Sequence, residues 1–187
     1  MARIYLDHAA TTPVDPKVAE AMVPYLTQHF GNPSSIHAFG REAKLAVETS
    51  RQTIASLLGA DAKEIIFTSG GTEADNLAVI GTALANRHRG NHIITSQVEH
   101  HAVLHALHFL EEHGFEVTYL PVNEAGQVRV EDVKKALRPQ TVLASFILVN
   151  NETGSLNPIE EIGRLLKERE IIFHTDGVQA LGALPLD

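Results

Sequence analysis

The chain has 187 residues, 44% hydrophobic and 20% charged, which is typical of a globular protein with one domain or one domain and part of another. Its formal net charge of −8 argues against general binding to nucleic acids or anionic membranes. The absence of cysteine excludes disulfides, thiolate metal sites and a thiol nucleophile within this chain. No apolar run reaches about 18 residues and no signal peptide is recognisable, so we expect a cytoplasmic protein.

The first third of the chain predicts two helices. Residues 1–14 are expected to be extended or looped, and Asp15 caps a helix whose first position is Pro16. Pro24 is expected to kink or shorten this helix. A longer helix is predicted over residues 39–58, after a loop rich in turn-forming residues.

From residue 64 onward, short runs rich in Ile, Val and Phe alternate with helical stretches. This alternation is typical of right-handed crossovers and of an α/β fold, with a mostly parallel sheet and flanking helices. Strands are predicted at 64–68, 92–95, 116–120, 142–149 and 171–174. Helices are predicted at 72–88, 101–113, 131–137 and 158–169. No covering helix follows the last strand, so we expect the fold to be incomplete at its C-terminus.

A tight turn, Gly70-Gly71, follows the first predicted strand, and Thr72 then begins a helix. The start of a helix has unpaired N–H groups and a partial positive charge, and glycines let a bound anion come close. The turn is therefore a candidate phosphate site. An ordinary helix capped by Thr72 explains this turn alone equally well, and neither a P-loop nor G-x-G-x-x-G is present.

Polar residues gather where the predicted strands end, which is where parallel sheets bind ligands. They include His100, Asn151, Asp176 and Gln179. Asp176 could bind a protonated ring nitrogen, and His100 could lie flat against the ring. Gln179 or Asn151 could donate to a ring oxygen. This set describes pyridoxal phosphate, although Asp176 alone could equally be a turn residue before a glycine.

Three of the eleven histidines, His101, His105 and His108, share one face of a predicted helix. Their spacing suits a metal, but no H-E-x-x-H motif, cysteine or carboxylate at ligand spacing accompanies them. We therefore expect a partly exposed polar face and no metal.

Six motifs follow one another along the chain: 4–13, 30–35, 67–76, Glu99-His100, 149–154 and 174–179. They include T-S-G-G-T-E-A-D-N, V-N-N-E-T-G and H-T-D-G-V-Q. Together they resemble the cysteine desulfurases of the NifS/IscS type, in the class V aminotransferase family with the type I pyridoxal-phosphate fold. The resemblance covers essentially the whole chain.

The resemblance implies pyridoxal 5'-phosphate as cofactor. Gly71 and Thr72 would bind its phosphate. His100, the implied catalytic residue, would lie over the pyridine ring, and Asp176 would bind the ring nitrogen.

It also implies that Gln179 contacts the phenolic oxygen and that Asn151 lies beside ring and substrate. Residues 1–14 resemble the segment that borders the small domain and the substrate. Residues 15–187 would then be the N-terminal part of the large, cofactor-binding domain.

The resemblance implies sulfur transfer from L-cysteine, in which a mobile cysteine takes the sulfur as a persulfide and L-alanine leaves. The family's Ser-x-His-Lys motif, whose lysine forms the Schiff base, and the persulfide cysteine are absent from these 187 residues. None of the six lysines follows a predicted strand. We therefore expect an N-terminal portion that is inactive alone.

Other interpretations remain open at this point: a non-catalytic protein that binds a partner or the cofactor, another type I enzyme such as a selenocysteine lyase or aminotransferase, or an unrelated nucleotide binder. The resemblance implies a homodimer or a complementing C-terminal chain. It also implies a sulfur acceptor or iron–sulfur scaffold protein as partner, and neither nucleic acid nor membrane.

Overall fold

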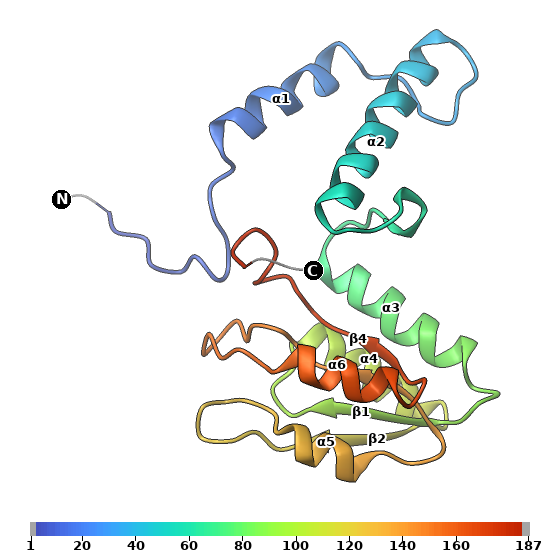
Figure 1. The fold of residues 1–187 in the computed structure, drawn as a ribbon. Helices are drawn as coiled ribbons and strands as arrows, with labels where there is room; N and C mark the ends of the chain where they lie inside the picture. Colours follow the sequence, from blue (N-terminus) through green and yellow to red (C-terminus); the bar gives the residue numbers. More distant parts are fainter. Residues whose placement is uncertain (1–2, 185–187) are drawn as a thin grey trace. The chain divides into compact units, whose positions relative to one another are not determined.

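The computed structural model describes residues 3–184, which fall into two compact units, 3–67 and 68–184. Each unit is described by itself. The first contains the helices α1 (Pro16–Thr27) and α2 (Ala38–Leu57) and the 3-10 helix η1 (Ala62–Glu64) (Figure 1). In the described chain no helix is both long enough and apolar enough to cross a bilayer.

The N-terminal cap of α1 is as predicted, because the Asp15 carboxylate accepts the Lys17 N–H at 2.8 Å. The expectation that Pro24 shortens the helix is wrong, since α1 continues to Thr27. Pro24 lies in the last turn, where few helical hydrogen bonds remain to be lost. Its carbonyl accepts the N–H groups of the two residues that follow the helix.

The strand predicted at 64–68 does not form. Residues 65–68 belong to no helix or strand, and Ile66 and Phe67 are 68% and 47% exposed. The guanidinium of Arg51 donates to the Ile65 carbonyl and lies 4.8 Å from the ring centroid of Phe67. A strand requires a neighbour for its backbone hydrogen bonds, and no strand of residues 3–184 pairs with this segment.

The second unit is built on a sheet of four parallel strands in the order β2-β1-β3-β4. The strands are β1 (His92–Ser96), β2 (Glu116–Leu120), β3 (Thr141–Ser145) and β4 (Ile172–His174). The helices are α3 (Gly71–Ala85), α4 (His101–Glu112), α5 (Val130–Ala136) and α6 (Ile159–Lys167). The α/β class is confirmed, with four strands in place of five. The strand predicted at 142–149 ends at Ser145, although the N–H groups of Phe146 and Leu148 still donate to the carbonyls of His174 and Asp176, and Val149 forms an antiparallel bridge with Leu156.

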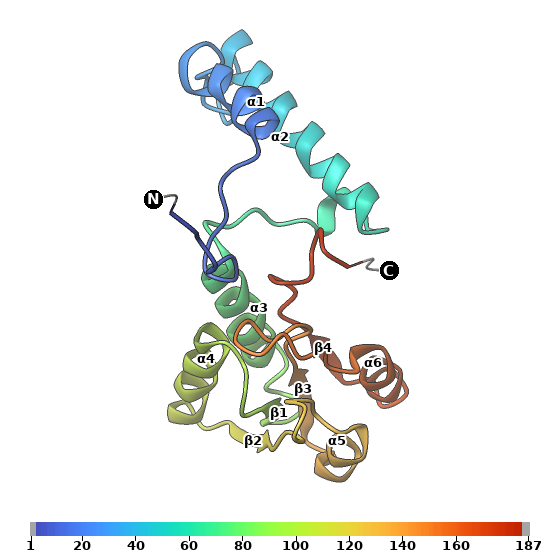
Figure 2. The ribbon, with the colours of Figure 1, turned by 90° about the vertical axis from the view of Figure 1, so that its left-hand side faces the viewer.

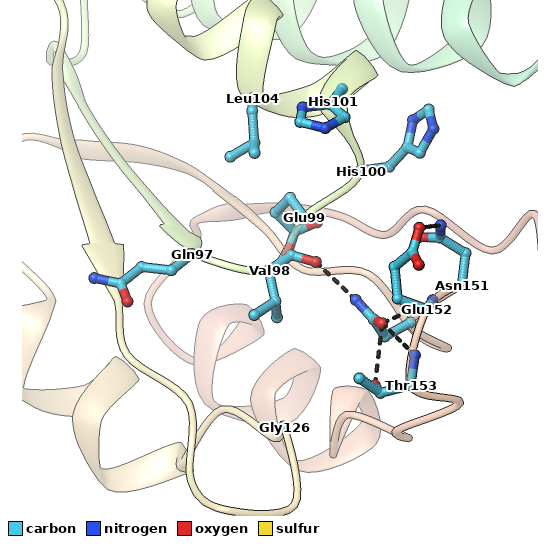
Figure 3. A pocket seen from close by; sticks show the side chains of 11 residues that line it. Gln97, Val98, Glu99, His100, His101, Leu104, Gly126, Asn151, Glu152 and Thr153 are labelled. Atoms are coloured by element: carbon cyan, nitrogen blue, oxygen red, sulfur yellow. Dashed lines mark hydrogen bonds between the residues drawn. The ribbon is translucent and has the colours of Figure 1, made fainter.

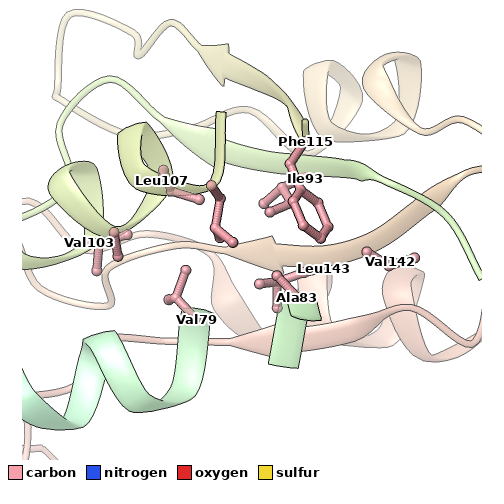
Figure 4. Packing of buried hydrophobic residues seen from close by; sticks show 10 residues of the cluster. Val79, Ala83, Ile93, Val103, Leu107, Phe115, Val142 and Leu143 are labelled. Carbon is pink, nitrogen blue, oxygen red and sulfur yellow. The ribbon is translucent and has the colours of Figure 1, made fainter. Parts of the chain in front are cut away.

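The helices cover both faces of this sheet, with α3 and α4 on one face and α5 and α6 on the other (Figure 2). Successive strand residues point to opposite faces. Ile93 therefore packs with Val79 of α3 and Leu107 of α4 (Figure 4), whereas Ile94 packs with Ile162 of α6. Both faces being covered explains why β1 and β3 are buried at every position.

Candidate functional site

The strand order places a candidate ligand site at one edge of the sheet. The chain leaves β1 through α4 toward β2, and it leaves β3 through α6 toward β4, on the opposite face. The carboxyl ends of β1 and β3 are therefore a topological switch point, where open α/β sheets bind ligands. A cleft of about 340 Å³ opens there, between residues 97–104 and residues 150–153.

Asn150 holds the two sides of this cleft together. Its buried amide group donates to the Val98 carbonyl at 2.9 Å. Its Oδ1 accepts the N–H groups of Glu152 and Thr153 at 3.0 and 2.9 Å, and the Thr153 hydroxyl at 3.0 Å. The turn that carries Asn151 is thereby fixed, and Asn151 lines the cleft together with His100 (Figure 3).

The glycine turn opens α3 without a capping side chain. Gly70 is the N-cap, and the first backbone bond of the helix runs from the Ala74 N–H to the Gly70 carbonyl. The N–H groups of the first turn therefore remain available to an anion. Thr72 is exposed in this turn. The Glu73 carboxylate bonds the N–H and the hydroxyl of Ser69, both at 2.6 Å, and these bonds lower its pKa.

Gly71 packs against the segment that follows β4. A Cβ on Gly71 would come 2.9 Å from Val178 Cγ2, which is closer than real side chains approach. The start of α3 and the turn that carries Gln179 therefore meet closely. Gln179 is half-buried, and the Asp176 carboxylate accepts the Val178 N–H at 2.9 Å.

Three side chains from three elements converge beside this turn. One carboxylate oxygen each of Asp75 and Asp176 and a ring nitrogen of His100 all lie within 4.8 Å of one another. Both carboxylates are buried, whereas His100 is exposed. His100 also caps α4, and its Nδ1 accepts the Ala102 N–H at 3.2 Å. A neutral His100 therefore carries its proton on Nε2.

The structure thus brings most of the predicted site residues near one another. Gly71, His100, Asn151, Asp176 and Gln179 all lie at the carboxyl edge of the sheet or at the start of α3 beside it. The three histidines on α4 are exposed, as expected for a polar face. All six lysines are exposed, and they lie on helices.

The sequence analysis placed Asp75 and Glu99 within motifs, and Glu99 after a predicted strand, but it gave neither residue a role in the site. Asp75 shares the buried stripe of α3 with Val79 and Ala83. An acidic residue in line with the apolar residues of a predicted helix was therefore the sequence feature that could have identified it. Glu99 is 5% exposed, and burial raises its pKa to about 7. The Ser96 hydroxyl donates to its Oε1.

The residues present fit a phosphorylated pyridine ring. The uncapped first turn of α3 suits a phosphate, and a Cβ at Gly70 would meet nothing within 4 Å, which shows open space at that point. The buried Asp176 suits a protonated ring nitrogen, and the exposed ring of His100 suits the flat face of an aromatic ligand.

Comparison with known proteins supports this fit. Residues 4–187 match the family model described as Aminotransferase class-V. The chain is 58% identical over 187 residues to a protein of Bacillus subtilis named putative cysteine desulfurase IscS 1. It is 54% identical over 184 residues to the cysteine desulfurase IscS of Methanosarcina thermophila. These matches cover 100% and 98% of this chain but 49% and 46% of the relatives, so the chain spans about half their length.

Solved structures give the same result. A NifS-like protein superposes with a TM-score of 0.96 at 38% identity, over 100% of this chain and 52% of that one. A structure described as SspA in complex with cysteine gives 0.94 at 43% identity, over 98% and 53%. The α/β fold and the resemblance to the NifS/IscS group are confirmed.

Proposed function

Because the chain belongs to the class-V aminotransferase family, whose desulfurase members depend on pyridoxal phosphate, we propose that it is the amino-terminal part of a cysteine desulfurase. The carrying observation is the convergence of Asp176, Asp75 and His100 beside the uncapped start of α3. The reaction is the release of sulfur from L-cysteine, leaving L-alanine. L-cysteine is the substrate we favour because a similar structure is described in complex with cysteine.

In this proposal, the bound cofactor supplies an electron sink. The N–H groups of Gly71 and Thr72 hold its phosphate at the helix start. The Asp176 carboxylate accepts a hydrogen bond from the ring nitrogen and keeps that nitrogen protonated. The His100 imidazole covers one face of the ring and excludes water from it. Asn151, at the rim of the cleft, donates to the ring or the substrate, and Gln179 donates to the phenolic oxygen.

The chain has no lysine in a position to bind the cofactor covalently. Lys63 pairs with Asp61 and Lys135 with Asp132, and every lysine side chain is exposed to solvent. The amine and the thiol nucleophile must therefore come from outside these 187 residues. We propose that the chain alone binds the cofactor but does not release sulfur.

We also propose that the active form is a homodimer or a complex with a complementing C-terminal chain. Support comes from the first unit, where large apolar side chains are exposed on α1 and α2, including Leu26 at 75%, Leu45 at 69% and Leu57 at 76%. Exposed apolar patches of this kind are typical of association surfaces. A sulfur acceptor or an iron–sulfur scaffold protein as partner, and the cytoplasm as location, remain proposals that the names of the relatives and the cysteine-free composition favour.

The proposal is tested by complementation. The chain is expressed alone and together with the second half of the Bacillus subtilis relative, the half that it does not match. Alanine and sulfide formation from L-cysteine are then measured, with Asp176→Asn in the complemented pair as a variant. We expect no turnover by the chain alone, turnover by the pair, and a large loss in the variant.

Sulfur release by the chain alone would contradict the assigned inactivity. Selenocysteine turnover in the pair without cysteine turnover would favour a selenocysteine lyase. A soluble pair that binds pyridoxal phosphate but turns over neither substrate would favour the non-catalytic interpretation.

A further inference from the structure

Two buried carboxylates lie close together in this site. Asp75 and Asp176 are each 5% exposed, and an oxygen of each lies within 4.8 Å of the other. Buried charges of like sign at this separation repel one another unless a cation lies beside one of them. A protonated ring bound to Asp176 would balance only one of the two charges, so Asp75 requires a partner of its own.

His174 is that partner. Its Nε2 lies 3.5 Å from Asp75 Oδ1, and its Nδ1 lies 2.8 Å from the Ser145 hydroxyl oxygen. Ser145 and His174 end β3 and β4 and are register partners in the parallel ladder. The sheet therefore fixes the imidazole, and α3 brings the carboxylate to it. The side chains of the ion pair are 14% and 7% exposed, so water screens their interaction little.

The charged and titratable groups around this pair come from three elements. Asp176 follows β4, His100 precedes α4, and Glu99 follows β1. Asp176 and His100 converge on Asp75, and the charges of Asp75 and Asp176 both act on Glu99. His174 does not belong to the group of three that converges within 4.8 Å, whereas Asp75 does. The negative end of the pair therefore faces the proposed ring site.

We propose that Asp75 and His174 are positioning residues of the proposed cofactor site, with the Asp75 carboxylate acting as a second negative charge that helps Asp176 keep a bound pyridine ring protonated. This inference rests on the proposed function. His174, held in place beside the Ser145 hydroxyl, positions the Asp75 carboxylate in its buried place at the edge of the proposed ring site. The ligand class is a phosphorylated pyridine whose ring nitrogen carries a proton.

The test measures the protonation of a bound ring in the full 187-residue chain. Pyridoxamine 5'-phosphate is the probe, because it has no aldehyde that could react with the exposed lysines. EDTA in every buffer excludes adventitious metal. The variants are Asp75→Asn and His174→Gln, and the matched control is Glu42→Gln, which breaks the His29–Glu42 pair of the other unit, 2.8 Å long and more exposed.

We expect Asp75→Asn to lower the pKa of the bound ring nitrogen, followed by absorbance against pH, by about one unit. Affinity for the probe at pH 8 should fall about tenfold. His174→Gln should not lower the pKa of the ring nitrogen, because the glutamine amide can still donate a hydrogen bond to the Asp75 carboxylate, which remains. Glu42→Gln should behave as the unmodified chain does.

Probe binding with an unchanged ring pKa in Asp75→Asn would overturn this inference and leave the proposed function standing. An equal drop of the ring pKa in both variants would overturn the assignment of the charge to Asp75 and of the positioning to His174. Failure of the unmodified chain to bind the probe would overturn the proposed binding, and this inference with it. A double-mutant cycle on the unfolding of the ligand-free chain tests the pair independently, and zero coupling between Asp75 and His174 would contradict it.

Discussion

Ser96, the last residue of β1, donates its hydroxyl proton across 2.5 Å to Oε1 of Glu99, whose Oε2 has no hydrogen-bond partner in the described part of the chain. Burial raises the pKa of Glu99 to about 7, and the nearby carboxylates of Asp176 and Asp75 act in the same direction. The hydrogen bonds to Glu99 oppose this shift without cancelling it.

The raised pKa of Glu99 predicts a loss of stability as pH rises from about 4.5 to about 7. In that window the folded chain holds a proton that the unfolded chain releases, so unfolding becomes easier as pH rises. The shift corresponds to about 3 kcal/mol. The free energy of unfolding in urea of Glu99→Gln, relative to that of the unmodified chain, should rise by this amount from about pH 4.5 to about pH 7, whereas the same difference for Glu112→Gln, an exposed change on α4, should stay constant. A profile in Glu99→Gln that matches the unmodified chain would refute the assignment.

Because His92 is buried, we expect the folded chain to lose stability in acid. His92 is fully buried, and its ring nitrogens lie 2.7 Å from the Thr141 hydroxyl and 2.8 Å from the Thr118 hydroxyl. Burial, helped by the positive charge of Arg138, lowers its pKa to about 4. The unfolded chain therefore holds a proton that the folded chain lacks, and stability falls as pH drops from about 6.5 to about 4.

The expected size of the His92 effect is about 2–3 kcal/mol. The stability of His92→Gln relative to the unmodified chain should increase by this amount as pH falls from about 6.5 to about 4, which unfolding midpoints measured from pH 4 to pH 7 would report. His88→Gln is the matched control, because His88 is exposed. If both variants keep the full acid sensitivity, another group is responsible.

Because Gly71 packs closely against Val178, we expect a larger side chain at this position to weaken ligand binding. In Gly71→Ala the new Cβ would come 2.9 Å from Val178 Cγ2, so Val178 would have to shift within the segment that carries Asp176 and Gln179. Affinity for pyridoxamine 5'-phosphate should fall about tenfold. The free energy of unfolding should change by only about 1 kcal/mol, because Val178 is exposed and can move.

The matched variant is Gly70→Ala. Its Cβ would meet no protein atom within 4 Å, and its φ of 165° is extended backbone open to any residue. We expect the segment around Val178 to keep its place in this variant, which backbone NMR shifts would report. Equal shift changes in both variants would show that the contact with Val178 is not what makes Gly71 necessary.

Asn150 predicts a large effect on stability and on the cleft. Asn150→Ala removes the bond to the Val98 carbonyl and leaves the donors of Glu152 and Thr153 without their acceptor. The cost should be about 3 kcal/mol. Asn151→Ala should change stability little, since its bond to the adjacent Glu152 is exposed. Chemical denaturation of the two variants decides this, and similar losses would argue against Asn150 as the anchor of the cleft.

The alternation of strand and helix and the polar residues at the strand ends could be predicted from the sequence, because both follow local periodicity. The segment 65–68 could not, since its apolar run satisfies the composition of a strand while its pairing depends on a neighbour that no local pattern reveals. The same limit explains Pro24, whose effect depends on its distance from the end of the helix.

The pairing of Asp75 with His174 could not be predicted from the sequence either. The two residues lie on elements far apart in the sequence, and only the sheet register that brings Ser145 beside His174 joins them. The motifs contained both residues, yet a motif does not say which side chain points inward. A charged residue within the apolar stripe of α3 was the one local hint.

The carboxylate of Asp75 in the buried stripe of α3 also creates a conflict between stability and ligand binding for protein engineering. A leucine at position 75, together with an apolar residue in place of His174, would extend the apolar contacts of Val79 and Ala83 and would make the isolated chain harder to unfold. Selection for yield or heat resistance would therefore favour replacing Asp75. Variants enriched in such a screen would fold more stably but would lack one of the charges facing the proposed ligand. At this residue, folding stability and ligand binding therefore favour different side chains.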